Sequence, residues 1–134
     1  MIRINSDNPD LIFGIPDAGG GETYFYQGQP FTGIIEDYFY DNPSVLAGET
    51  QVVNSHTDGR QTTYWPNGQL QEEYFEKNHR SYNTHKTWNE QGNQVSYSEY
   101  SQPGKYKVHK DWDDQGNLTR HWEIINGVEM KIID

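Results

Sequence analysis

The chain has 134 residues, of which 32% are hydrophobic and 14% aromatic, and it contains no cysteine. This composition indicates one domain or one short repeat array, and it excludes a disulfide framework or a thiolate metal site. The formal net charge of −10 opposes binding to nucleic acid or to anionic lipid. With no apolar signal segment after Met1 and no run of ~18 apolar residues, we expect a cytoplasmic protein that does not enter a membrane.

The first 23 residues are expected to form an N-terminal arm and loop. Leu11, Ile12 and Phe13 make the most apolar triplet of this region, and a glycine-rich stretch follows from Gly14 to Gly21. That stretch lacks the Lys-Ser/Thr ending of a phosphate-binding loop. Residues 24–134 are then expected to form a single β-hairpin repeat domain.

From Thr23 onward, short β-prone runs alternate with turn signals such as Thr57-Asp58-Gly59 and Asn67-Gly68. Asn-Gly is a strong hairpin signal because both residues tolerate the positive φ of a tight turn. No stretch of helical length places apolar residues at a period of 3.6. The pattern predicts an all-β fold: an antiparallel meander of about eight to ten strands in one twisted sheet, without substantial helix.

The meander is predicted to be an internal repeat. Three glycines recur at intervals of 24 residues, each with an aromatic residue four positions earlier, and a weaker copy is centred on Ser44. The glycines are Gly68, Gly92 and Gly116, and the aromatic residues are Tyr64, Trp88 and Trp112. Each unit is expected to be one hairpin, and stacked hairpins bury surface that a single hairpin cannot.

Alternation along the strands predicts two unlike faces. If Gln115 is the centre of its loop, His109 lies opposite His121 and Trp112 opposite Leu118. One face then carries Tyr82, Trp88, Tyr106, Val108, Trp112, Leu118, Trp122 and Ile124 and is expected to be buried. The other carries His85, His109, Asp111, Thr119, His121 and Glu123.

No residue pattern supports catalysis, a metal or a cofactor. Equivalent histidines of successive hairpins, His85 and His109, lie two strands apart, about 9.5 Å, which is too far for a shared zinc ion. The sequence from Asp111 to Gly116 resembles the start of a calcium loop, but Trp122 stands where that loop needs a glutamate. Adjacent carboxylates such as Glu72 and Glu73 point to opposite faces of a strand. We therefore expect a non-enzymatic protein without bound metal or cofactor.

The segment from Tyr64 to Phe75, Tyr-Trp-Pro-Asn-Gly-Gln-Leu-Gln-Glu-Glu-Tyr-Phe, resembles the variant MORN repeat. Tyr24 to Gly33 resembles the segment that opens such arrays. Together they resemble the YwqK-like antitoxins that accompany secreted bacterial toxins. The resemblance implies an antiparallel sheet of repeats that binds another protein, and it implies no catalytic residues.

We therefore expect an immunity protein that binds the toxic C-terminal domain of a secreted bacterial effector, a cationic nuclease-type domain, and covers its basic active-site cleft. All of the net charge lies in residues 1–76, with twelve acidic residues against two arginines. Such a field attracts cationic partners; the competing interpretation is that the charge only keeps a polar sheet soluble. The expected partner-binding residues are Tyr24, Tyr26, Glu36, Asp37, Tyr38, Tyr40, Asp41 and Asp58, although Tyr38 and Tyr40 also fit a core. Two alternatives stay open: a carbohydrate-binding module with exposed Tyr and Trp, and a structural scaffold.

Overall fold

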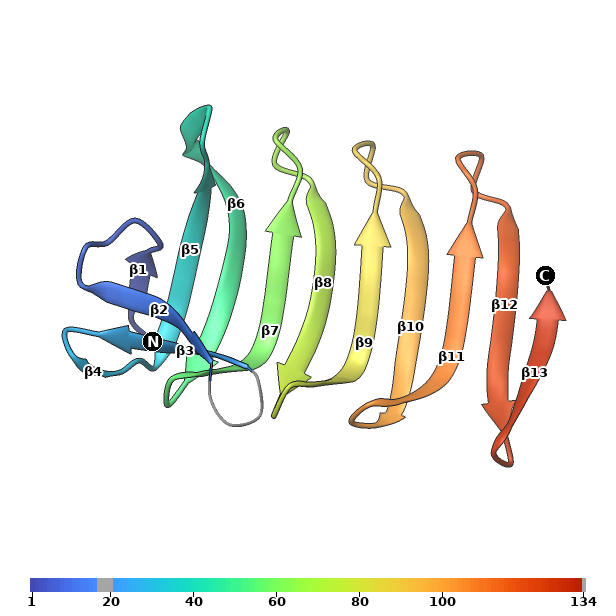
Figure 1. Ribbon diagram of the computed structural model, residues 1–134. Helices are drawn as coiled ribbons and strands as arrows, with labels where there is room; N and C mark the ends of the chain where they lie inside the picture. Colours follow the sequence, from blue (N-terminus) through green and yellow to red (C-terminus); the bar gives the residue numbers. More distant parts are fainter. Residues whose placement is uncertain (17–20, 134) are drawn as a thin grey trace.

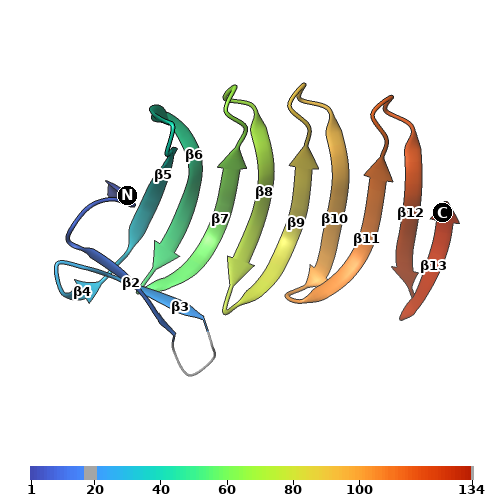
Figure 2. The same ribbon diagram turned by 45° about the horizontal axis from the view of Figure 1, so that its top comes forward.

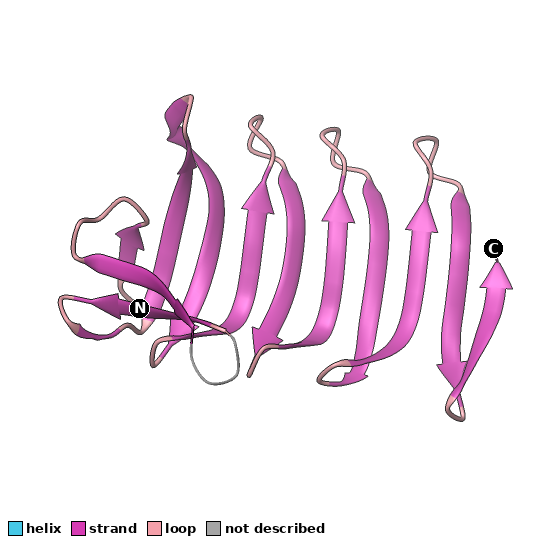
Figure 3. Cartoon of the chain, viewed as in Figure 1, coloured by secondary structure: helices cyan, strands magenta, loops and turns pink. Residues whose placement is uncertain are grey.

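The computed structural model describes residues 1–16 and 21–133, and the regular structure of these residues is all β-strand (Figure 3). Ten strands form a main sheet in the order β1-β5-β6-β7-β8-β9-β10-β11-β12-β13, and β2-β3-β4 form a small sheet. The strands are β1 (Arg3–Asn5), β2 (Leu11–Pro16), β3 (Glu22–Tyr26), β4 (Gln29–Pro30), β5 (Gly33–Phe39), β6 (Asn42–Val53), β7 (His56–Tyr64), β8 (Leu70–Lys77), β9 (Arg80–Trp88), β10 (Gln94–Gln102), β11 (Lys105–Trp112), β12 (Leu118–Ile125) and β13 (Val128–Ile133).

The main sheet is the expected meander. From β5 to β13 each strand pairs antiparallel with the next, and the hairpins stand side by side in chain order (Figure 1). The predicted all-β meander without helix is therefore confirmed. Two features were not predicted: β1 adds to β5 as a parallel strand, and the small sheet lies across the end of the main sheet near β5 to β7 (Figure 2).

The five-residue turns, which all lie at the same end of the strands, carry the 24-residue repeat. In each, a five-residue loop closes with two backbone hydrogen bonds; in the last, Asp113 N donates to Asn117 O and Gly116 N to Asp113 O. The repeated glycines have positive φ values of 89°, 87° and 81°, whereas Asn67 does not have a positive φ. The prediction of a hairpin at Asn67-Gly68 was right, but the expected tight turn with two positive φ values was wrong.

Replacing Gly116 by alanine is expected to lower the free energy of unfolding by about 1–2 kcal/mol, because the left-handed conformation strains a residue with a Cβ atom. The φ of Gly116 is +81°, and a Cβ built on it meets no other atom, so strain alone is tested. Urea unfolding followed by circular dichroism would measure the change. The matched variant Gly116→Asn is expected to lose less, since asparagine tolerates this conformation; equal losses would contradict the explanation.

Two-residue turns connect the strands at their opposite ends. Asn54-Ser55, Asn78-His79 and Asn126-Gly127 each have two positive φ values, as expected for turns that follow the twist of a hairpin. The predicted turn at Thr57-Asp58-Gly59 was wrong, because these residues lie inside β7. The chain had already reversed at Asn54-Ser55, which carries no glycine and was not recognised as a turn.

The apolar core lies at the N-terminal end of the molecule, where the small sheet covers the main sheet. Its buried residues are Ile4, Leu11, Phe31, Ile35 and Val52, with Tyr24 and Tyr26 packed against them. The small sheet is also tied to the main sheet through its backbone, since Tyr24 N donates to Ser55 O and Ser55 N donates to Phe31 O. The segment expected to be an arm thus forms β1, β2 and the start of β3. The expected boundary at residue 24 falls inside β3. Residues 17–20 of the expected glycine-rich loop lie outside the described residues.

From β8 to β12 the main sheet is a single layer with rings on both faces, and most of its side chains are only half-buried. The predicted division into a buried and a polar face was wrong. A register shift between Asp111 and Trp112 pairs His109 with Trp122 and His121 with Lys110. The expected pair of Trp112 with Leu118 does form, but one extra residue in β12 reverses the faces beyond it, as β-bulges do. His109 accordingly stacks on Trp122, with ring centroids 5.5 Å apart.

Candidate functional site: an acidic pocket under the small sheet

A pocket of about 210 Å³ opens where the small sheet meets the main sheet. β2 and β3 supply Phe13, Glu22 and Tyr24, and β5 supplies Asp37; the pocket is completed by Ser6, Leu11, Ile35 and Thr50. These residues meet because β2 and β3 pair antiparallel, with Phe13 opposite Tyr24. Because side chains alternate along β5, Ile35 and Asp37 share the face that the small sheet covers, so an apolar floor and a carboxylate lie in the same pocket.

The walls of this pocket combine rings with carboxylates. The rings of Phe13 and Tyr24 are 6.1 Å apart and tilted by 33°, and the Tyr24 hydroxyl donates to Glu22 over 3.1 Å. Asp37 is exposed. Within residues 1–16 and 21–133, neither Glu22 nor Asp37 forms an ion pair with a cation of the chain. The pocket therefore holds two carboxylates that no cation of the described residues neutralises.

The pKa of Tyr24 responds to burial and to the carboxylates around the pocket. Burial raises the pKa of Tyr24 most, and the carboxylates of Glu22, Asp37 and Glu76 raise it further, well above its usual value. The phenol thus stays protonated at neutral pH and keeps donating its hydrogen to Glu22. Rings with adjacent carboxylates are the surroundings in which a lysine or arginine side chain binds, through ion pairing and cation–π attraction.

The eight residues predicted from the sequence do not form one site. Tyr24 and Asp37 line the acidic pocket, and Tyr26 packs on Phe31 in the core, with ring centroids 5.9 Å apart. The other five lie elsewhere. Glu36 is on the opposite face of β5, Tyr38 is towards the end of that strand, and Tyr40 and Asp41 are in the turn that follows it. Asp58 is on β7, near the two-residue turn that precedes this strand. Tyr40 is fully exposed, at 101%, so its possible role as a core residue was wrong.

Glu36 belongs to an internal ion-pair network. Arg3 bonds both Glu36 and Glu49, bringing together β1, β5 and β6. Burial opposes ionisation of Glu49, but hydrogen bonds from Arg3, Tyr64 and Thr62 outweigh it and lower the pKa of that carboxyl. Because these charges are already paired, Glu36 has less to offer a cationic partner than Asp37 has.

Sequence reasoning missed Glu22 and Phe13, the other charged and aromatic walls of the pocket. Glu22 lies just before the Tyr24-Phe25-Tyr26 stretch, and the expected boundary at residue 24 excluded it. The signal available in the sequence was the pattern of β3, in which Glu22 and Tyr24 share a face by alternation.

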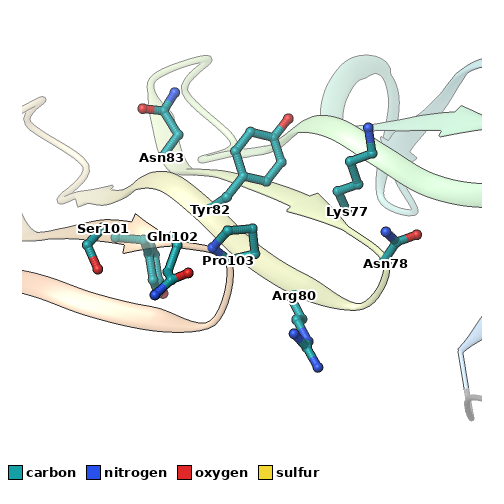
Figure 4. A pocket seen from close by; sticks show the side chains of 9 residues that line it. Lys77, Asn78, Arg80, Tyr82, Asn83, Ser101, Gln102 and Pro103 are labelled. Carbon is teal, nitrogen blue, oxygen red and sulfur yellow. The ribbon is translucent and has the colours of Figure 1, made fainter.

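A second and larger pocket, of about 750 Å³, lies between the β8–β9 turn and the β10–β11 turn. Figure 4 shows Lys77 and Asn78 at one end of it and Ser101 and Gln102 at the other, with Tyr82 and Pro103 between them. Arg80 also lines it. Two cations give this pocket the opposite charge to the acidic one, so the two pockets would not serve the same ligand.

Ser98, His109 and Asp111 form a hydrogen-bonded chain that the sequence did not reveal. Ser98 Oγ is 2.8 Å from His109 Nδ1, and His109 Nε2 is 3.0 Å from Asp111 Oδ2. A serine nucleophile must be reached by the substrate carbonyl, but Ser98 is buried and His109 is held under Trp122. We interpret these hydrogen bonds as structural, because they satisfy polar groups that are buried on the sheet surface.

The described residues contain no group of three or more histidines, cysteines or carboxylates close enough to hold a metal ion. They also contain no helix that would be long and apolar enough to cross a membrane.

In comparisons with known proteins, no protein-family model matches the chain, and no curated protein shows significant similarity to it.

Proposed function

We propose that the chain is an immunity protein, which binds the toxic C-terminal domain of a secreted bacterial effector in the cytoplasm and neutralises it by covering a basic active-site cleft. The observation that carries the proposal is the acidic pocket, where Glu22 and Asp37 lie beside the rings of Phe13 and Tyr24 without an ion pair to any described cation. A lysine or arginine of the toxin would enter it. In this proposal the chain acts by binding, without catalysis or a cofactor.

The distribution of charge and rings supports a protein partner. Carboxylates steer a cationic surface into contact and raise the association rate, whereas desolvated rings hold the complex. Both kinds of residue occur together at the pocket, and Phe13 is 52% exposed there. The resemblance of Tyr64 to Phe75 to variant MORN repeats agrees with this class of partner.

A carbohydrate-binding module is the second candidate, favoured by the ring cluster of Tyr100, Tyr106 and Trp122 on the single-layer part of the sheet. Sugars bind aromatic residues through open ring faces. Here Tyr100 and Tyr106 stack on each other with centroids 4.8 Å apart, and Trp122 stacks on His109. Because one face of each of these rings is already covered by a stacked ring of the chain, we prefer the protein partner.

Co-expression tests the proposal. Where the reading frame directly upstream of this chain encodes a large secreted protein, the C-terminal domain of that protein would be expressed in a sensitive bacterium, alone and with the chain. Growth should stop with the domain alone and recover when the chain is present, and the two proteins should co-purify. An inactive substitution in the toxin provides the control for expression burden. Toxicity that persists with the chain present would contradict the proposal, as would the absence of such a neighbouring gene.

A further inference from the structure

Strand β13 forms one edge of the main sheet and offers an unusual surface. It runs from Val128 to Ile133, and all six of its residues are exposed. The exposed fraction is 58% for Val128, 46% for Met130 and 52% for Ile132. Among the described residues, only β12 pairs with it. Within residues 1–16 and 21–133 its outer backbone groups have no strand partner, and exposed apolar edges of this kind invite pairing.

The other end of the sheet is protected. There the edge strand β1 has only three residues, Arg3–Asn5, and the small sheet covers the adjoining strands with the apolar core. Natural sheets commonly shorten or cover their edges in this way to prevent association. The contrast with β13 indicates that the two ends of the sheet have different roles.

The sequence of β13, Val-Glu-Met-Lys-Ile-Ile, is complementary to itself in one antiparallel register. If two copies pair about a two-fold axis through Met130, Glu129 of each copy lies opposite Lys131 of the other. Val128 then lies opposite Ile132, and Met130 opposite Met130. From Val128 to Lys131, where β13 pairs regularly with β12, side chains alternate, so both charge pairs lie on one face and Val128 and Met130 on the other. Opposite charges placed directly across antiparallel strands stabilise the pairing, and like charges destabilise it.

We propose that two copies of the chain associate through β13, which joins their main sheets into one continuous sheet. The two-fold pairing uses the open edge of both copies, so the assembly closes as a dimer and does not grow further. The small sheet lies at the end of the main sheet away from β13 (Figure 1), and its residues Phe13, Glu22 and Tyr24 line the acidic pocket. The dimer would therefore present two partner sites at its two ends.

Sedimentation velocity on the purified full chain tests the dimer. Between about 1 μM and about 500 μM, a range that brackets the affinity of small interfaces, the mass should rise from 15.6 kDa towards twice that value. The variants E129K and K131E should each stay monomeric, with association weakened at least about tenfold, because two like-charge pairs replace two favourable ones. An equimolar mixture of these two variants should form a dimer, since their charges are again complementary.

The double swap E129K/K131E should restore self-association, because it exchanges the charges and keeps them complementary. K107E is the matched control: Lys107 is exposed on β11, away from the edge, so this variant should dimerise like the original chain. Circular dichroism and thermal unfolding of each variant would show that the fold is kept. A chain that stays monomeric throughout the range would overturn the proposal. So would dimers that survive both single charge changes, open-ended polymers, or a double swap that fails to dimerise.

Discussion

Replacing Phe31 by alanine is expected to lower the free energy of unfolding by about 3–5 kcal/mol, as deletion of a buried ring does. Phe31 is only 3% exposed and packs between the small sheet and the main sheet with Ile35 and Val52. Its backbone also accepts the Ser55 hydrogen bond that joins the two sheets. The loss should therefore loosen the small sheet as well as the core. Urea unfolding followed by circular dichroism and by tyrosine and tryptophan fluorescence would measure it.

Two comparisons make the Phe31 result specific. Tyr40→Ala is expected to change stability little, because its side chain is fully exposed. Trp112→Ala is expected to cost less than Phe31→Ala, since Trp112 is half-buried on a single-layer sheet. A larger effect at Trp112 than at Phe31 would place the main stabilising contacts in the repeats and contradict the position of the core described above.

The repeat was predictable because each hairpin is specified locally. A glycine at the left-handed position and flanking β-prone residues determine each five-residue turn, and these signals recur every 24 residues. Trp65 Nε1 also donates to Trp88 O of the following hairpin, so neighbouring turns interlock in a way that keeps the period. The all-β class and the order of the hairpins follow from these short-range signals.

The faces of the strands could not be predicted from alternation alone. One bulge between Asp111 and Trp112 was enough to place His109 beside Trp122. Bulges of this kind recur in nearly every strand pair of the sheet, as between Thr63 and Tyr64 and between Gln94 and Ser96. Each bulge changes the parity of all later residues in its strand, and no single residue type marks it in the sequence.

The acidic pocket was only partly predictable. Its charge followed from the excess of carboxylates in residues 1–76, and Tyr24 and Asp37 were named from the sequence. Its position depends on a long-range contact, because β2 and β3 must fold back across β5 before Glu22 and Asp37 share one pocket. Residues 1–23 carry few repeat signals, so nothing local indicated that they cover the end of the main sheet.

Reversing the two unpaired carboxylates, Glu22→Lys with Asp37→Lys, is expected to weaken binding of the proposed toxin by at least about 2 kcal/mol, because a cation loses its partners and meets like charge instead. The association rate should fall, and its dependence on salt should become weaker, since fewer charges attract the partner at long range. Stopped-flow or surface plasmon resonance at two or more ionic strengths would measure both quantities.

The matched control is the same change of charge at exposed carboxylates in the neutral half of the chain, Glu90→Lys with Asp114→Lys. These lie in the repeat turns, away from the acidic pocket. Asp113 is unsuitable for this purpose, because its carboxylate accepts backbone hydrogen bonds from Asn117 and Gln115, which lower its pKa and stabilise the turn. Both pairs of substitutions change the net charge of −10 equally, so general attraction is held constant and position alone differs. Binding that falls equally in both variants would show that net charge attracts the toxin and that the pocket does not select it. We expect a clear loss for the Glu22 and Asp37 pair and near-original binding for the control.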